Sequence, residues 1–286
     1  MANVNNILVA DCGSTKTDWI LSGLECGILE VRTMGINPVR DSRDAIFRVL
    51  SEELMPQLPS DCGVEDIFFY GAGCMEPYSL SIKEALLELF PDARVSVESD
   101  LLGAARALCG HQEGVACILG TGANSCFYDG NKIVSHVSPL GFILGDEGSG
   151  AVLGKIFVAN LLKGIFPESM KQDFFQEYEL SEVDVIDRVY RQPQPNRFLA
   201  SIVPFIGKHR GVPFVHDMLV DSFRSFFSRN VRAYHRAEMP VNFVGSIAYI
   251  YNNELQEAAK AEGFLLGKVL RSPIYEILSF HINQSK

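Results

Sequence analysis

Three short glycine-containing turns carry the residue types with which a chain holds a phosphate group. They span residues 11–17 (Asp-Cys-Gly-Ser-Thr-Lys-Thr), 120–125 (Gly-Thr-Gly-Ala-Asn-Ser) and 245–248 (Gly-Ser-Ile-Ala), and each follows a short apolar run. Glycine lets the main chain approach an anion closely, Ser and Thr hydroxyls donate hydrogen bonds, and Lys16 adds a positive charge. One such turn alone is usually a tight hairpin, but three of them at strand ends favour a phosphate site.

The best-known phosphate-binding sequences fit these turns poorly. The chain has no Gly-x-x-x-x-Gly-Lys-[Ser/Thr] pattern, which excludes a Walker-A nucleoside triphosphatase. Residues 120–125 resemble Gly-x-Gly-x-x-Gly but end in Ser125, and an apolar strand-like run follows where a dinucleotide-binding turn would open a helix. A dinucleotide site is therefore disfavoured.

The elements that must position these turns alternate between strands and helices, which indicates an α/β fold. Residues 115–128 repeat the pattern of residues 7–19, a strand, a polar glycine turn and a second strand, so the chain is expected to hold two related halves. Residues 241–244 are the last clear strand. The predicted strands are 6–10, 18–22, 28–33, 66–70, 94–97, 115–119, 126–128 and 241–244; the predicted helices are 43–55, 79–90, 101–108, 151–163 and 274–282, with 166–237 mostly helical.

Length and charge limit the classes of function. At roughly 150 residues per domain, 286 residues suggest two domains or two lobes. Twenty-five Lys and Arg against 35 Asp and Glu give a net charge of −10, which argues against non-specific binding of nucleic acid or anionic lipid. The uncharged runs are too short to span a bilayer, and the N-terminus lacks a basic segment. A cytoplasmic protein without nucleic-acid or membrane partners is expected.

Cysteine and histidine spacings give no metal or disulfide pattern. The seven cysteines include no Cys-x-x-Cys pair, and the six histidines form no His-x-x-x-His. Reduced structural thiols and no protein-caged catalytic metal are therefore expected.

The turns, taken in order, resemble motifs of the sugar kinase/Hsp70/actin superfamily. Residues 11–17 resemble its first phosphate loop, residues 120–124 its second, and residues 243–248 (Phe-Val-Gly-Ser-Ile-Ala) its adenosine motif. Glu-Ser-Asp at 98–100 and Gly-Asp-Glu-Gly-Ser-Gly at 145–150 are most similar to the N-acetylglucosamine kinase and BadF/BadG/BcrA/BcrD ATPase family. This resemblance runs across essentially the whole chain.

The resemblance implies two ribonuclease-H-like lobes that close on ATP and substrate. The first lobe would comprise residues 1–108 with the C-terminal helix 273–286 crossing back to it, and the second residues 109–272. The implied ATP-binding residues are Asp11 (acting on Mg²⁺ through water), Gly13, Ser14, Thr15, Lys16, Gly120, Thr121, Gly122, Ala123, Gly245 and Ser246, with Ala200 a weaker candidate; the implied substrate residues are Asn37, Asp100, Asn124, Gly141 and Asp146.

Asp100 is the candidate for the chemistry. It lies where a predicted strand ends and a helix begins, so its carboxylate can orient an attacking hydroxyl and accept its proton late in phosphoryl transfer. The alternative is a helix-capping role, which Ser99 could equally fill. Asp146 could likewise cap helix 151–163, and Asn37 and Asn124 could be turn asparagines.

The resemblance implies an ATP- and Mg²⁺-dependent kinase that phosphorylates an amino sugar, N-acetylglucosamine or glucosamine, on its 6-hydroxyl. Two alternatives stay open: an ATPase activator with a bridging iron–sulfur cluster, and a nucleotide-binding regulator without turnover. The activator needs paired exposed cysteines, whereas Cys117 and Cys126 fall in apolar strands and are expected to be buried. Phe- and Val-rich helices around 214–231 hint at a homodimer, although core packing explains them equally well.

Two departures from the pattern concern the sugar site. The family's Trp before Gly-Asp-Glu-Gly is missing, since the chain's only Trp is Trp19; Phe142 could supply an aromatic platform in its place. The Cys/His zinc cluster of the ROK-type sugar kinases is also absent from the sequence.

Overall fold

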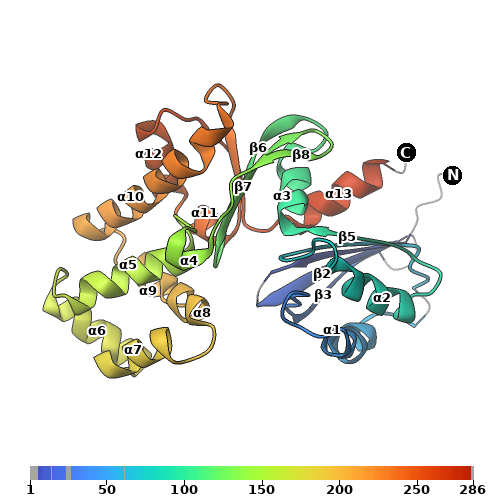
Figure 1. Ribbon diagram of the computed structural model, residues 1–286, viewed down its shortest axis with the longest axis horizontal. Coiled ribbons are helices and arrows are strands. Elements are labelled where there is room, and N and C mark those ends of the chain that lie inside the picture. Colours follow the sequence, from blue (N-terminus) through green and yellow to red (C-terminus); the bar gives the residue numbers. More distant parts are fainter. Residues whose placement is uncertain (1–5, 14, 24–26, 61, 285–286) are drawn as a thin grey trace. The chain divides into compact units, whose positions relative to one another are not determined.

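The computed structural model describes residues 6–13, 15–23, 27–60 and 62–284. The chain divides into two compact units, and each contains a five-stranded sheet. The first unit comprises Met1–Glu113, Asp129–Ile133 and Ser272–Lys286, and the second Gly114–Tyr128 and Val134–Arg271 (Figure 1). Among the described helices, none has the length and hydrophobicity that a membrane crossing requires.

The first sheet mixes a meander with parallel strands. Its order is β3-β2-β1-β4-β5, in which β2 pairs antiparallel with β1 and β3, while β1, β4 and β5 run parallel. The carboxyl ends of β1, β4 and β5 therefore meet at one edge, where ligands bind in open α/β sheets. The strands are β1 (Ile7–Cys12), β2 (Lys16–Gly23), β3 (Gly27–Met34), β4 (Asp66–Gly71) and β5 (Arg94–Ser99).

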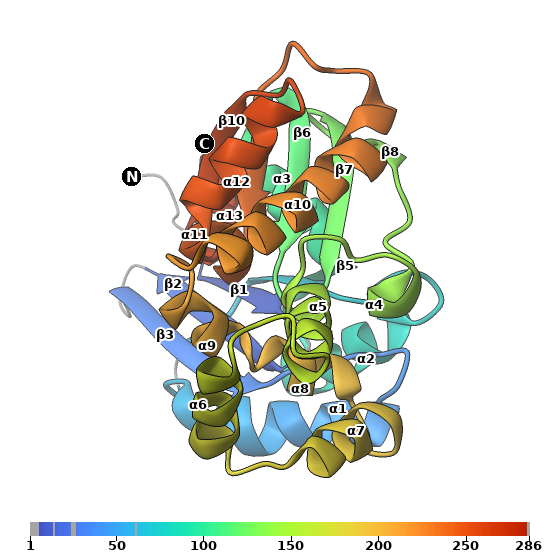
Figure 2. The ribbon, with the colours of Figure 1, turned by 90° about the vertical axis from the view of Figure 1, so that its left-hand side faces the viewer.

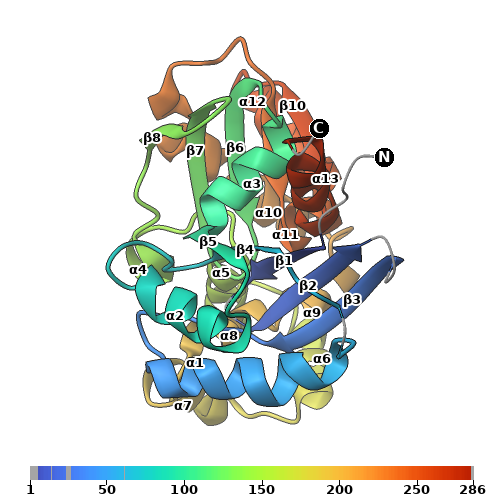
Figure 3. The same cartoon turned by 90° about the vertical axis from the view of Figure 1, so that its right-hand side faces the viewer.

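Helices cover both faces of this sheet (Figure 3). One face carries α1 (Arg43–Val49) and α2 (Ser79–Leu89), and buries Trp19 edge-on against Phe69. The other face carries α3 (Asp100–Cys109) and the C-terminal helix α13 (Ile274–Gln284), which pack on each other and on β1. The helix predicted over 43–55 forms, but it is α-helical only to Val49, and a π turn (Leu50–Leu54) and a 3₁₀ turn (Met55–Gln57) continue it.

The second sheet has the order β10-β9-β6-β7-β8, with β9 parallel to both β6 and β10. Its helices build an aromatic core in which α10 packs on α5 and α12 (Figure 2). The strands are β6 (Glu113–Leu119), β7 (Ala123–Asp129), β8 (Ile133–His136), β9 (Val241–Val244) and β10 (Leu266–Leu270); the helices are α4 (Gly141–Leu144), α5 (Gly150–Leu162), α6 (Glu168–Tyr178), α7 (Glu182–Tyr190), α8 (Pro195–Ala200), α9 (Val203–Lys208), α10 (Pro213–Arg229), α11 (Ser246–Ile250) and α12 (Asn252–Ala261).

Most predicted elements are confirmed, but the prediction that 241–244 is the last strand is wrong. β10 follows at Leu266–Leu270, and β8 was also not predicted. Both are edge strands with no fully buried residue, so neither shows the apolar pattern by which strands are recognised. Most apolar residues of α10, including Val215, Leu219 and Phe223, are buried in the core, although Phe214 is exposed. Core packing therefore accounts for most of this helix, and a homodimer stays a prediction.

Candidate active site

A row of side chains crosses the first sheet at the carboxyl end of its parallel strands. Asp11 on β1 pairs with Tyr70 on β4, and Tyr70 pairs with Glu98 on β5. On the other side, Asp11 pairs with Asp18, and Asp18 with Arg32. Residues paired in this way share one face of a sheet. The row therefore places acidic groups from β1, β2 and β5 on one face.

Contacts with α3 and α13 show which face of the sheet carries this row. The Tyr70 hydroxyl accepts a hydrogen bond from Arg106 on α3 (2.6 Å) and lies 2.7 Å from Nε2 of His281 on α13. His281 also stacks on Phe68, with ring centroids 3.5 Å apart. Burial lowers the pKa of His281 to about 4, and the Arg106 guanidinium adds to this effect. The row thus lies on the face that α3 and α13 cover.

Asp100 is the first residue of α3 and immediately follows β5. Ser99 caps the helix, since its hydroxyl accepts the Leu102 N–H at 3.2 Å, so the capping role considered for Asp100 belongs to its neighbour. The Asp100 carboxylate accepts the Leu101 N–H at 2.8 Å. Burial raises its pKa, and this hydrogen bond partly opposes the rise. Asp100 is thus a half-buried acid at the positive end of a helix.

Asp11 is an acid with a strongly raised pKa at the same edge. Burial, together with the carboxylates of Asp100 and Asp18, raises its pKa to about 7, and Lys16 opposes the rise. A carboxylate whose pKa is raised by neighbouring carboxylates is stabilised by a cation, and carboxylate oxygen atoms are the donors that Mg²⁺ prefers. The residues at this edge therefore fit the Mg²⁺ that the resemblance implies.

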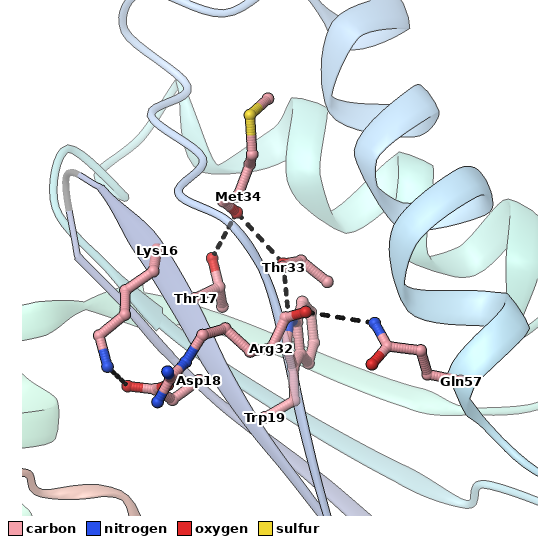
Figure 4. Close-up of polar contacts among 8 residues, drawn as sticks. All are labelled: Lys16, Thr17, Asp18, Trp19, Arg32, Thr33, Met34 and Gln57. Carbon is pink, nitrogen blue, oxygen red and sulfur yellow. Dashed lines mark hydrogen bonds and ion pairs between the residues drawn. The ribbon is translucent and has the colours of Figure 1, made fainter.

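The turn between β1 and β2 is held by two backbone hydrogen bonds. The Gly13 N–H donates to the Lys16 carbonyl (3.0 Å), and the Gly35 N–H donates to the Thr15 carbonyl (3.1 Å). The Lys16 ammonium pairs with the Asp18 carboxylate at 2.6 Å, and Arg32 pairs with the same carboxylate at 2.7 Å (Figure 4). The remaining predicted residue of this turn, Ser14, lies outside the described residues.

The loop that carries Asn37 is tied to β1 by a thiol. The Sγ of Cys12 accepts hydrogen bonds from the Thr17 hydroxyl (3.0 Å) and the Ile36 N–H (3.2 Å). The Asn37 Oδ1 accepts the Val39 N–H at 3.0 Å, so this asparagine does form the turn that its sequence suggests. A side-chain carbon added at Gly73 would lie 3.1 Å from the same Oδ1, which places Asn37 beside the loop after β4. Cys12 was not predicted to support the site.

In the second unit, the turn after β6 packs on the start of α5. The Gly150 N–H donates to the Gly120 carbonyl (2.8 Å), and the Ala151 N–H to the Thr121 carbonyl (3.1 Å). A side-chain carbon added at Gly150 would come within 3.3 Å of the Ala200 methyl, so Ala200 adjoins the same turn. The structure thus brings together three segments far apart in sequence.

Gly245 lies beside the same turn, at the end of β6. Its φ of +125° favours glycine, and a side-chain carbon there would lie 2.2 Å from the Leu119 carbonyl oxygen at the end of β6. The next residue, Ser246, begins α11. The predicted nucleotide residues of this unit therefore gather where β6 and β9 end.

Asp146 joins the same group from the loop before α5. Its Oδ1 accepts the Ala123 N–H at 3.1 Å, and burial raises the pKa of its carboxyl. Its φ is +56°, a left-handed conformation that is uncommon for a residue with a side chain and often marks a functional position. Ser149 caps α5 by accepting the Val152 N–H (3.2 Å), so capping does not explain Asp146.

Two residues beside this loop, Gly141 and Phe142, are predicted to lie at the sugar site. Gly141 is exposed and begins the short helix α4 with a φ of +73°. Phe142 is half-buried, and its carbonyl accepts a hydrogen bond from Lys155, which ties α4 to α5.

Asn124 is the second residue of β7, and it contacts a residue that the sequence did not single out. Its Oδ1 accepts the Ser125 N–H at 3.0 Å and lies 2.9 Å from Nε2 of His136 on β8. His136 is absent from the predicted site because β8 itself was not predicted.

Cys117 and Cys126 are fully buried, as their apolar strands predict. Cys12 and Cys74 in the first unit are buried free thiols. Within the described ranges, His, Cys, Asp and Glu form no group of three or more that could hold a metal ion.

Solved structures share this fold. A proposed N-acetylglucosamine kinase from Porphyromonas gingivalis is 46% identical, with 98% of this chain and 100% of that chain covered and a TM-score of 0.95. Another from Chromobacterium violaceum is 16% identical, with 99% and 100% covered and a TM-score of 0.74. A ROK-family glucokinase from Streptomyces griseus, solved with glucose and AMPPNP, is 14% identical, with 98% of both chains covered and a TM-score of 0.55. No protein-family model and no curated protein sequence matches the chain.

Proposed function

This chain belongs to the N-acetylglucosamine kinase-like family of the sugar kinase/Hsp70/actin superfamily, and we propose that it transfers the γ-phosphoryl group of ATP to the 6-hydroxyl of an amino sugar, N-acetylglucosamine or glucosamine. It has the α/β fold of two ribonuclease-H-like lobes that the resemblance implied, and it is an ATP-dependent sugar kinase. The acceptor, the hydroxyl and the roles of individual residues are the parts that we propose.

The observation that carries the proposal is the pair of acids at the carboxyl edge of the first sheet. Asp100 stands at the start of α3, and its charge raises the pKa of Asp11. Neither acid is needed to cap a helix, since Ser99 fills that role. Two half-buried acids with raised pKa values at a ligand-binding edge are typical of a catalytic site.

Asp100 acts as the base. Its carboxylate orients the sugar hydroxyl, whose oxygen forms a bond to the γ-phosphorus while the bond from that phosphorus to the ADP oxygen breaks. The hydroxyl proton passes to the Asp100 carboxylate late, because the transition state is loose. Burial raises the pKa of Asp100, which makes its carboxylate a better proton acceptor.

Asp11 supports the nucleotide side of the reaction. When bound, Mg²⁺ neutralises charge on the phosphate oxygens, and Asp11 would hold it through water. Gly13, Ser14, Thr15 and Lys16 would donate to the phosphates from the first unit.

The second unit contributes residues of its own that would bind the phosphates and the sugar. Residues 120–123 would bind phosphate, with Gly245, Ser246 and Ala200 near the adenosine. Asn124, Gly141 and Asp146 would contact the sugar, as Asn37 would in the first unit. The left-handed backbone of Asp146 and its hydrogen bond to the Ala123 N–H support a shared sugar and phosphate site in this unit.

The two alternatives are less well supported. An iron–sulfur activator needs accessible cysteines, whereas Cys117 and Cys126 are fully buried. A regulator without turnover would not need an acid at Asp100. A cytoplasmic location and a homodimer stay predictions from the sequence.

The test is a coupled ADP-release assay over hexoses, hexosamines and N-acetylhexosamines, with the product's phosphorylation site read by NMR. Asp100→Asn should fold normally and lose about 100-fold or more in kcat. Asp92→Asn, the same change in an exposed loop of the first unit, is the matched control. Near-normal turnover by Asp100→Asn contradicts the base, and ATP hydrolysis that no sugar stimulates contradicts the kinase.

A further inference from the structure

The side chain of Asn124 is held in one orientation by two partners. Its Oδ1 lies 3.0 Å from the Ser125 N–H. A backbone N–H can only donate, so the atom it meets must be the carbonyl oxygen of the carboxamide and not its nitrogen. The two ends of the carboxamide are thereby distinguished.

The same oxygen decides the tautomer of His136. Nε2 of this ring lies 2.9 Å from the Asn124 Oδ1, and two acceptors would repel at that distance. Nε2 must therefore carry a proton and donate it. Because the imidazolium form also donates through Nε2, the contact survives protonation of the ring.

The two donors occupy both lone pairs of Oδ1, which leaves the amide nitrogen of Asn124. Among the residues that the structure describes, no hydrogen bond is made by this Nδ2, whose two N–H groups are free to donate. Asn124 follows the turn 120–123, whose last N–H is bonded to Asp146. The residue that carries this donor is thus the direct chain neighbour of the turn assigned to phosphate.

We infer that His136 is a positioning residue that sets substrate specificity: it fixes Asn124 with its amide N–H groups toward the sugar, and so selects a sugar that presents an acceptor oxygen there. This inference rests on the proposed function. An N-acetyl carbonyl or a neutral hydroxyl supplies such an oxygen. The protonated amine of glucosamine offers only donors, so it would oppose the amide.

Without His136, Asn124 can rotate and present either end of its carboxamide. Where a donor of the protein faces a donor of the sugar, no hydrogen bond forms and both groups stay unsatisfied. Rotation would therefore weaken binding of the acceptor sugar and reduce discrimination against the amine.

The experiment compares KM and kcat for N-acetylglucosamine, glucose and glucosamine at a pH where the amine is protonated. His136→Leu should raise KM for N-acetylglucosamine by about 3- to 10-fold, with little change in kcat or in KM for ATP, and should narrow its preference over glucosamine by a similar factor. His136→Gln keeps a side-chain N–H and should restore much of the preference. Asn124→Asp, which replaces the donor by an acceptor, should shift the preference toward glucosamine.

The control is His216→Leu, which removes a half-buried histidine of the second unit that contacts Glu257 on α12 at 2.9 Å. This variant should leave KM and kcat for all three sugars unchanged. Glucose distinguishes between the two acceptor oxygens. If KM for glucose changes in each variant as KM for N-acetylglucosamine does, Asn124 contacts a hydroxyl. If KM for glucose does not change in this way, Asn124 contacts the N-acetyl carbonyl. An unchanged KM and preference in His136→Leu overturns the inference while the kinase assignment stands. A wild-type protein that phosphorylates no sugar overturns both.

Discussion

Replacing Asp11 by Asn should make the metal-free protein more stable above neutral pH while it removes phosphoryl transfer. Burial and the carboxylates of Asp100 and Asp18 raise the pKa of Asp11 from 3.8 to about 7. The folded state therefore binds more protons than the unfolded state between these values. The stability of the wild type falls as pH rises through that window, because the buried group must ionise.

The size of the effect follows from the shift. At about 1.4 kcal/mol per pKa unit, a shift from 3.8 to about 7 corresponds to about 4 kcal/mol at pH 8, about 1.5 kcal/mol at pH 5 and almost nothing near pH 4. Asn has no charge to ionise, so the variant escapes this cost. Its amide must still be accommodated at a half-buried position, so about 2–4 kcal/mol is expected at pH 8.

Urea unfolding from pH 4 to pH 8, followed by fluorescence, measures this directly. The only tryptophan, Trp19, is buried in the first unit, which also holds Asp11, so it reports on that unit. Asp129→Asn is the control, and its effect on stability should have the opposite sign. The N–H groups of Lys132 and Asn131 lower the pKa of Asp129, so its carboxylate stabilises the folded state and its loss should reduce stability. Mg²⁺ with ADP should stabilise the wild type more than Asp11→Asn. A variant equally or less stable at pH 8, or a gain that does not grow between pH 4 and pH 7, would refute the reasoning.

Two further predictions concern stability. Burial lowers the pKa of His281 to about 4, so the unfolded state takes up more protons below pH 6.5, and the first unit should lose up to about 3 kcal/mol as pH falls from 6.5 toward 4. His281→Gln should show a shallower pH slope in the same urea experiment, and an identical slope would contradict the assignment. Gly245→Ala combines a positive φ with a clash against the Leu119 carbonyl and should cost more than about 2 kcal/mol. Gly110→Ala, which has a φ of +60° but open space, should cost less, and equal losses in urea would rule out the clash.

Much of the architecture could be predicted because it is local. The strands around Asp11 and Asp100 are apolar runs that end at polar residues, and the C-terminal helix follows a Ser-Pro break. Such patterns depend on neighbours within a few positions, which the sequence displays. The edge strands β8 and β10 were missed, since a strand that buries no residue fully lacks that signal.

The candidate site was only partly visible in the sequence. The order of its motifs identified the family and placed an acid where β5 meets α3, because that position depends only on the residues around it. Why Asp11 has a raised pKa and which residue of β8 meets the Asn124 carboxamide were decided by tertiary structure. Each depends on contacts between strands, helices or loops that the sequence does not place side by side, and hydrogen bonds and burial act through space, not along the chain.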